Sequence, residues 1–259
     1  MGQVSLVDVS KRFALRVEKE VHVVNALNGV SFDVKDGEIA VLIGPSGCGK
    51  TTALRIAMGL ETATRGRVMV DGRTVTGCGY DRGLVFQHAE LLPWLTAFQN
   101  VMFGLEMKGM RGAELKDTAM RYLKLVGLEQ SANRRPHQLS GGMKQRVGIA
   151  RALAIDPAVL LMDEPFGALD AQTREGLQAE LLDIQARTGK TILFVTHDLD
   201  EAVLLADRII VLRAGSLQEI IEVGLPRPRG DLAAVRGSAE FAETRYRIWK
   251  ALHQAETTH

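Results

Sequence analysis

The sequence predicts an α/β fold in which a largely parallel sheet is combined with a helical insertion. Three observations lead to this prediction. Nearly continuous apolar runs at 38–44, 158–165 and 191–197 are typical of strands buried on both faces of a parallel sheet. Residues 91–158 instead carry Leu, Met, Lys and Glu at helical spacing. Shorter segments in which apolar and polar residues alternate flank these regions, and they indicate an additional antiparallel part.

The elements of the N-terminal part follow from its spacing and its turn residues. Residues 4–10 and 29–34 alternate apolar and polar side chains, as half-buried strands do. The buried strand at 38–44 ends in glycine, and 51–60 then has the spacing of a helix. Residues 67–72 are predicted to be a strand that runs into a turn.

The C-terminal part is predicted to contain a hairpin and a final helix. The two later buried strands both end in polar residues, where open α/β sheets place their active groups. Residues 207–223 fit two antiparallel strands around Ala214-Gly215. From Leu225 the chain continues as LPRPRG and closes with a predicted helix around 239–255.

Composition excludes several classes of protein. Lys and Arg number 32 against 31 Asp and Glu, a net charge of +1 that gives no reason to expect a nucleic-acid partner. The 46% apolar content of the 259 residues suffices for a sizeable core. Cys48 and Cys78 show neither metal-ligand nor disulfide spacing, which favours a reducing compartment. We expect no secretory signal and no transmembrane segment, because no apolar run approaches about eighteen residues.

A phosphate-binding loop is predicted at 44–52. The segment GPSGCGKTT matches G-x-x-x-x-G-K-[ST] and lies between a predicted strand and a predicted helix. Its glycines let the backbone curl so that consecutive N–H groups point at phosphates. Lys50 is expected to reach the β- and γ-phosphates, and the Thr51 hydroxyl to hold Mg²⁺. The residues predicted to surround the phosphates are Gly44, Pro45, Ser46, Gly47, Cys48, Gly49, Lys50, Thr51 and Thr52.

Cys48 lies inside this loop, and two interpretations of it are open. Its closeness to Lys50 and to a helix start would lower the pKa of its thiol. Alternatively, it is a small residue that simply fits the loop.

Two carboxylates, Asp163 and Glu164, end the apolar strand of VLLMDEP. Asp163 is predicted to join the Mg²⁺ shell beside Thr51, and Glu164 to face the attacking water as general base. Paired carboxylates at a strand end are otherwise typical of a solvated loop. The phosphate-binding loop earlier in the chain favours the catalytic interpretation.

Gln87 and His197 also follow apolar strands. The strand of His197 is expected beside that of Asp163, so that the imidazole can hydrogen-bond a γ-phosphate oxygen and position Glu164. Gln87 is predicted to touch Mg²⁺ or the lytic water and to begin the helical insertion. The alternatives are a structural histidine and an ordinary loop glutamine.

A second phosphate-binding pattern occurs in LSGGMKQR at 139–146. The hydroxyl of Ser140, the bare backbone of Gly141 and Gly142 and the start of a helix are together suited to an anion. A plain helix N-cap is the alternative for this composition.

Taken in order, these motifs resemble those of an ATP-binding-cassette (ABC) ATPase subunit of a prokaryotic importer, over roughly residues 4–223. GPSGCGKT resembles the Walker A motif, LSGGMKQR the ABC signature and VLLMDEP the Walker B motif. Gln87 resembles the Q-loop, GALD at 167–170 the D-loop, and His197 the switch histidine. Phe13 falls where the family keeps an aromatic that stacks on adenine, and a buried strand-end aromatic is its alternative.

The resemblance implies an α/β fold: a P-loop NTPase (RecA-like) core with an antiparallel β subdomain and an inserted α-helical subdomain. It implies an ATPase domain at 1–225. Within it, the core and β subdomain would occupy 1–90 and 159–225, and the helical subdomain 91–158. Residues 226–259 would form a short tail with a helix.

The resemblance also implies a head-to-tail homodimer with ATP and Mg²⁺ held between the copies. The loop of one chain would grip the phosphates, and Ser140, Gly141 and Gly142 of the other would cap the same γ-phosphate. Asp170 would lie at the dimer centre. The signature usually carries glutamine where this chain has Met143, a change expected to affect fine tuning of the interface rather than phosphate binding.

A membrane permease is the partner that the resemblance implies. Residues 91–110 are rich in Leu, Met, Phe and Trp, and Trp94 and Phe98 are candidates for a groove that receives a short permease helix. The chain would then work at the cytoplasmic face of the inner or plasma membrane, linked indirectly to a solute-binding protein and to no nucleic acid.

Four segments, at 83–94, 163–174, 223–230 and 241–252, resemble the nitrate, sulfonate and taurine importer group. We also expect no regulatory domain of about a hundred residues, which sugar importers usually carry. An extended basic linker is the alternative interpretation of LPRPRG. ABC ATPases of DNA repair or chromosome maintenance are the alternative class. In that class a long coiled coil separates the Walker A motif from the signature, whereas no heptad run occurs here between 91 and 139.

Overall fold

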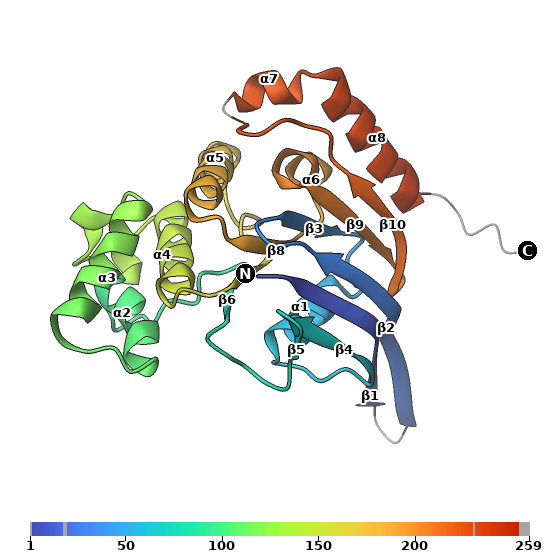
Figure 1. The fold of residues 1–259 in the computed structure, drawn as a ribbon, viewed down its shortest axis with the longest axis horizontal. Coiled ribbons are helices and arrows are strands. Elements are labelled where there is room, and N and C mark those ends of the chain that lie inside the picture. The colour runs from blue at the N-terminus through green and yellow to red at the C-terminus, as the bar shows by residue number, and fades with distance from the viewer. Residues whose placement is uncertain (1, 18–19, 230, 254–259) are drawn as a thin grey trace, which may run out of the picture. The chain divides into compact units, whose positions relative to one another are not determined.

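The computed structural model describes residues 2–17, 20–229 and 231–253 (Figure 1). The chain divides into two compact units. The first unit combines Met1–Cys78 with Thr191–His259, and the second unit comprises Gly79–Lys190.

The first unit contains an antiparallel sheet in the order β2-β1-β4-β5. Strands β1 (Val4–Val17) and β2 (Glu20–Val34) form a long hairpin, and β4 (Arg65–Val70) and β5 (Arg73–Thr74) follow it. Both strands of the hairpin extend well beyond the predicted 4–10 and 29–34. Register shifts in β1 interrupt the two-residue alternation, and Val23 and Val24 in the extension are exposed. These irregularities explain why the pattern of the sequence does not reveal the full length of the hairpin.

The first unit also contains the buried parallel strands. They lie in the order β10-β9-β3-β8. Strand β3 (Ile39–Ile43) runs parallel to both β8 (Thr191–Thr196) and β9 (Arg208–Arg213), and all of its side chains are fully buried. Strand β10 (Ser216–Glu222) pairs with β9 as the predicted antiparallel hairpin.

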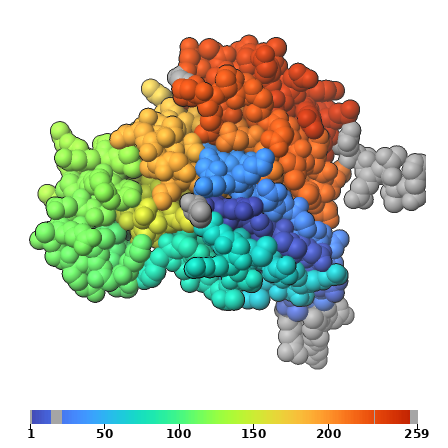
Figure 2. Space-filling view, in the orientation of Figure 1, coloured from blue at the N-terminus to red at the C-terminus, as the bar shows by residue number. Residues whose placement is uncertain are grey.

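Four helices lie in the described part of the first unit. Helix α1 (Lys50–Met58) follows β3, and α6 (Leu199–Leu205) follows β8. Near the C-terminus lie α7 (Leu232–Arg236) and α8 (Ala239–His253). The helix predicted around 239–255 is thus confirmed over 239–253, and residues 254 and 255 lie outside the described residues. Helix α8 packs against α6, β9 and β10. Figure 2 shows the red chain of α7 and α8 directly against the orange chain of this region.

The second unit is mainly helical, as expected for the insertion. Strand β6 (Arg82–Val85) pairs in parallel with β7 (Val159–Asp163). The α-helices of this unit are α2 (Ala97–Met107), α3 (Gly112–Leu125), α4 (Gly141–Ala154) and α5 (Ala171–Thr188). Two short 3₁₀ turns, Glu129–Ser131 and Pro136–Gln138, precede α4. Helix α4 packs against α2, α3 and α5 and is the centre of the unit.

No helix within the described part of the chain combines the length and the apolar character needed to cross a bilayer.

Candidate nucleotide site

The phosphate-binding loop lies between β3 and α1, and its glycines are required by close contacts. A Cβ atom added at Gly44 would lie 2.2 Å from the carbonyl oxygen of Leu212. At Gly49 it would lie 2.3 Å from the carbonyl oxygen of Ala26. Gly49 has φ 103° and Gly47 has φ 80°, values that favour glycine. Gly44 and Gly49 are therefore required by the backbone segments against which the loop packs, and Gly47 and Gly49 by the conformation of the loop itself.

Lys50 is folded back over this loop. Its side chain is only 5% exposed, and its Nζ donates to the carbonyl oxygens of Gly44 at 2.7 Å and Pro45 at 3.0 Å. Both partners are neutral, so the ammonium has no carboxylate among these acceptors. A phosphate oxygen near the loop would supply the opposite charge at this point. The loop and the start of α1, where Gly49 has no side chain to act as cap, are therefore suited to the phosphates of a nucleotide.

Gln87 and Glu164 lie together at the carboxyl end of the β6-β7 pair. The last parallel partners are Val85 and Met162, so both side chains come from the residues just beyond the same edge. A Cβ atom added at Gly167 would lie 3.2 Å from Gln87 Nε2 and 3.8 Å from Glu164 Oε2. The second unit thus brings the predicted Q-loop and the predicted general base to one place.

Glu164 has an unusual backbone conformation. Its φ of 45° lies in the left-handed region, which a residue with a side chain adopts at an energetic cost. Its carbonyl accepts from the Gly167 N–H at 3.0 Å, and Phe166 beside it is fully buried. This turn ends the strand directly after Asp163. It leaves the carboxylates of Asp163 and Glu164 half-buried rather than fully solvated.

The signature segment begins α4. Ser140 is its N-cap, because the Ser140 Oγ accepts from the Met143 N–H at 3.2 Å. A Cβ atom added at Gly142 would lie 2.5 Å from Thr173 Cγ2, and one at Gly141 would lie 3.2 Å from Leu169 Cδ2. The glycines therefore serve the close packing of α4 on the start of α5, a reason that the sequence pattern does not reveal. Ser140 is therefore a helix N-cap, as the alternative interpretation predicts. An N-cap serine is also compatible with anion binding at the same helix end.

Asp170 is the N-cap of α5. Its Oδ1 accepts from the Thr173 N–H at 3.0 Å, and this bond lowers the pKa of the Asp170 carboxyl. Its predicted place at a dimer centre stays a prediction, as does the stacking role of Phe13. Phe13 is half-buried in β1, and Lys11 Nζ lies 4.8 Å from its ring centroid.

His197 lies in a short turn between β8 and α6. Asp198 caps α6, because its Oδ1 accepts from the N–H groups of Asp200 at 2.9 Å and Glu201 at 3.1 Å. The Asp198 N–H in turn donates to Thr196 Oγ1 at 3.0 Å. The imidazole is exposed, but the backbone on both sides of it is fixed.

Comparison with known proteins identifies the family. A family model described as ABC transporter matches residues 27–167, more than half of the chain. The chain belongs to the ABC transporter family. It is an ABC-type ATPase, and its fold is the predicted P-loop NTPase core with a β part and a helical insertion.

Several relatives of this ABC ATPase cover nearly its whole length. An uncharacterized ABC transporter ATP-binding protein of Methanocaldococcus jannaschii is 52% identical, over 88% of this chain and 85% of the relative. The nitrate import ATP-binding protein NrtD of Synechocystis is 47% identical over 90% of both chains. The taurine import ATP-binding protein TauB of Rhizobium johnstonii is 43% identical over 94% of both.

A solved structure has the same fold. It is a dimeric ATP-binding cassette in a post-hydrolysis state, bound to ADP and Pi. It superposes with a TM-score of 0.74 at 38% identity, over 85% of this chain and 98% of that chain.

The ABC ATPase braces its Q-loop in a way that the sequence does not predict. Gln145 of α4 is buried, and its Nε2 donates to the Phe86 carbonyl at 2.9 Å. Arg151, on the same face of α4, donates to the carbonyls of Ala89 and Glu90, both at 2.8 Å. Burial lowers the pKa of Arg151, although the charge of Glu90 opposes this. The sequence gives little signal for this brace, because Gln145 lies between Lys144 and Arg146 and does not stand out among the polar residues of α4.

A pocket of about 460 Å³ lies within the second unit beside this brace. Its lining includes Gln87 from the Q-loop, Gly141 and Lys144 from the signature helix, and Leu169 from the D-loop. The motifs at 87, 139–146 and 167–170 therefore surround one cavity of the ATPase.

Of the two interpretations of Cys48, the lowered pKa is wrong and the small residue that fits the loop is confirmed. Its thiol is 4% exposed, and burial raises its pKa more than Lys50 and the backbone N–H groups lower it. The closeness to Lys50 was predicted correctly, but desolvation of the thiolate is the larger effect. Cys48 is thus the small buried residue of the alternative interpretation.

We therefore predict that alkylation distinguishes the two thiols of the ATPase. Near neutral pH, iodoacetamide should modify the exposed Cys78 and leave Cys48 unmodified, because Cys48 is buried from the reagent and burial also raises the pKa of its thiol. Mass spectrometry of peptides from the native protein measures both sites, and urea-unfolded protein is the control in which both react. Equal labelling of both cysteines in the native protein would contradict this assignment.

Proposed function

We propose that this ABC ATPase is the ATP-hydrolysing subunit of an importer and that it works as a head-to-tail homodimer. The observation that carries the proposal is that one chain has two helix N-termini, at α1 and at α4, that begin at glycine or serine and have no acidic residue in the first turn, which makes both suited to a phosphate. A single nucleotide on one chain has no need of the second. The dimeric cassette with ADP and Pi supports the proposal, and so do the relatives named as import ATP-binding proteins.

In this proposal the loop at 44–52 holds the ATP phosphates, with Lys50 as the cation that pairs with the β- and γ-phosphates. Thr51, Asp163 and Gln87 offer hydroxyl, carboxylate and amide oxygens, which are the ligand types that Mg²⁺ prefers. When bound, Mg²⁺ would neutralise charge on the phosphates. Phe13 would stack on the adenine.

Hydrolysis needs a base and a group that senses the γ-phosphate. Glu164 would accept a proton from the attacking water, and the strained turn after β7 would aim its carboxylate. His197 would donate a hydrogen bond to a γ-phosphate oxygen and orient the water. Ser140, Gly141 and Gly142 of the second copy would complete the site, with Asp170 near the dimer axis.

We propose the domain organisation given by the resemblance, with an ATPase domain at 1–225, a helical subdomain at 91–158 and a tail at 226–259. The helical region carries the surface suited to a permease. Trp94 is 66% exposed, and Phe103 and Met107 are also exposed.

The loop that carries Trp94 is ordered by Asn100. Asn100 is fully buried, its Oδ1 accepts from the Leu92 N–H at 2.8 Å, and its Nδ2 donates to the Thr96 carbonyl at 2.9 Å. A rigid apolar surface next to the Q-loop is suited to a short helix of a membrane permease. The ATPase would then work at the cytoplasmic face of the membrane, and a solute-binding protein would deliver nitrate, a sulfonate, taurine or a related solute.

Glu164→Gln tests the role of the general base. The variant should bind ATP and lose turnover by at least about 100-fold, because the amide cannot accept the proton of the water. ATP-dependent dimers should accumulate, as measured by size-exclusion chromatography with light scattering. Glu129→Gln makes the same chemical change at an exposed residue of the second unit and should behave as wild type. Normal hydrolysis by Glu164→Gln would remove Glu164 from this role.

Ser140→Arg tests the contribution of the second chain. Ser140 is exposed, so the substitution should leave folding and ATP binding by the single chain nearly intact. Turnover should fall by about 100-fold, because the bulky side chain blocks the helix N-terminus that caps the partner's γ-phosphate. Asn133→Arg, also exposed, adds the same charge elsewhere in the second unit and is the control. If Ser140→Arg turns over ATP as wild type does, the two-chain site is wrong.

A further inference from the structure

The C-terminal end of α6 is capped by two arginines from LPRPRG. Helix ends leave carbonyl groups without partners inside the helix. Arg229 Nη1 donates to the Leu204 carbonyl at 2.5 Å, and its Nη2 donates to the Ala206 carbonyl at 2.6 Å. Arg227 Nη2 donates to the Leu205 carbonyl at 3.2 Å. The segment is therefore not an extended linker, because its cations satisfy the orphan carbonyls of one helix.

Charge complementarity strengthens this cap. The C-terminal end of a helix is negative, so a guanidinium there is stabilised. Arg229 is 6% exposed, and burial followed by the charge of Arg227 lowers its pKa to about 10. It still carries its proton at neutral pH. A buried cation retained in this position is costly unless its contacts hold it in place, which indicates a fixed geometry.

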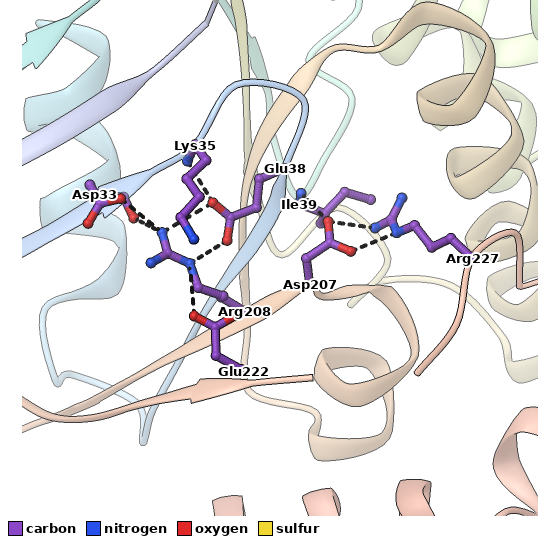
Figure 3. A network of polar contacts seen from close by, with 8 residues as sticks. All are labelled: Asp33, Lys35, Glu38, Ile39, Asp207, Arg208, Glu222 and Arg227. Carbon is purple, nitrogen blue, oxygen red and sulfur yellow. Dashed lines mark hydrogen bonds and ion pairs between the residues drawn. The ribbon is translucent and has the colours of Figure 1, made fainter. Parts of the chain in front are cut away.

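Arg227 also ties α6 to the central strands (Figure 3). Its Nε and Nη2 form a fork on the Asp207 carboxylate, at 2.7 Å and 2.9 Å. Asp207 Oδ2 accepts from the Ile39 N–H, the first residue of β3, at 2.8 Å. Bidentate arginine-carboxylate pairs fix orientation as well as distance. The end of α6 is thus held in register with β3.

The first turn of α6 is held by the last helix. Arg245 of α8 pairs with Asp200 at 2.5 Å. Asp200 directly follows the capped turn that carries His197, and its N–H donates to Asp198. Ile248 of α8 is fully buried, as α8 packs against α6. Arginines of the C-terminal segment therefore hold both ends of α6.

A helix of seven residues is too short to be stable alone, so its position depends on what holds it. We propose that Arg227, Arg229 and Arg245 are positioning residues for His197, because they fix the helix whose N-terminal turn carries the histidine. This inference rests on the proposed function of His197 in ATP hydrolysis. It gives the C-terminal tail a role in the ATPase reaction.

The chain offers a matched pair for the test. Arg245 and Arg247 both lie on α8, both form exposed ion pairs at 2.5 Å, and only Arg245 has its partner on α6. The partner of Arg247 is Glu219 on β10. Arg245→Gln should lower kcat for ATP at least about threefold with KM unchanged, whereas Arg247→Gln should leave both unchanged. Arg245→Lys should restore part of kcat, because it keeps the charge.

The two arginines that cap the C-terminal end of α6, Arg227 and the buried Arg229, are expected to have a larger effect than Arg245. Arg227→Gln and Arg229→Gln should each lower kcat by about tenfold with little change in KM, because the phosphate-binding loop lies at the other end of β3. Hydrogen exchange at residues 197–206 should be faster in these variants and in Arg245→Gln than in wild type and Arg247→Gln. Circular dichroism checks folding of the full chain. If Arg227→Gln or Arg229→Gln fails to fold, the comparison of Arg245→Gln with Arg247→Gln alone tests the positioning role.

His197→Ala in the same assay separates the proposed role of His197 in hydrolysis from the proposed positioning role of the arginines. Wild-type kcat in His197→Ala would overturn the proposed role of the histidine, and the positioning role with it. A large loss of kcat in His197→Ala, together with wild-type kcat in folded Arg245→Gln or Arg227→Gln, would overturn only the positioning role. Equal losses in Arg245→Gln and Arg247→Gln would also overturn it, since they would report a general effect of the tail.

Discussion

The account depends on one electrostatic constraint: a triphosphate needs converging positive groups, and each chain presents two helix ends suited to supply them. Helices α1 and α4 both begin without an acidic residue in their first turn, at Gly49 and at Ser140. By contrast, α6 carries Asp200 and Glu201 in its first turn. Acidic side chains in a first turn offset the positive end of a helix, so α1 and α4, which have none there, are suited to an anion.

In the second unit, side-chain contacts connect the Q-loop, the signature helix and the start of α5. Gln145 and Arg151 tie α4 to the segment after β6, and Gly142 packs against Thr173 at the start of α5. Q-loop, signature and D-loop are thereby parts of one packed assembly. A displacement at Gln87 would move the signature helix with it rather than bend the chain locally.

The motifs and the buried strands could be predicted from the sequence because they depend on local composition and order. The continuous apolar run of β3 and the glycine pattern after it are sufficient to place the phosphate-binding loop. The pairing of β9 with β10 follows from the turn at Ala214-Gly215. The roles assigned to His197 and Phe13 stay predictions.

Features that depend on contacts between distant residues could not be predicted. Nothing near LPRPRG indicates that Arg229 caps a helix that ends more than twenty positions earlier. The raised pKa of Cys48 follows from the burial of its thiol. The sequence shows only that Lys50 is near, and it does not indicate this burial. Gly142 matches a phosphate-binding pattern, and a side chain at this position would also clash with Thr173. The sequence indicates only the first of these two reasons for a glycine.

The claim that no single chain owns a complete catalytic site is tested most directly by the dependence of hydrolysis on protein concentration. ATP turnover per chain should be measured across a dilution series, with the oligomeric state followed by light scattering at each point. The account predicts that turnover per chain falls toward zero as dimers dissociate and reaches a plateau where they are saturated. Constant turnover per chain down to concentrations at which only monomer is present would contradict it.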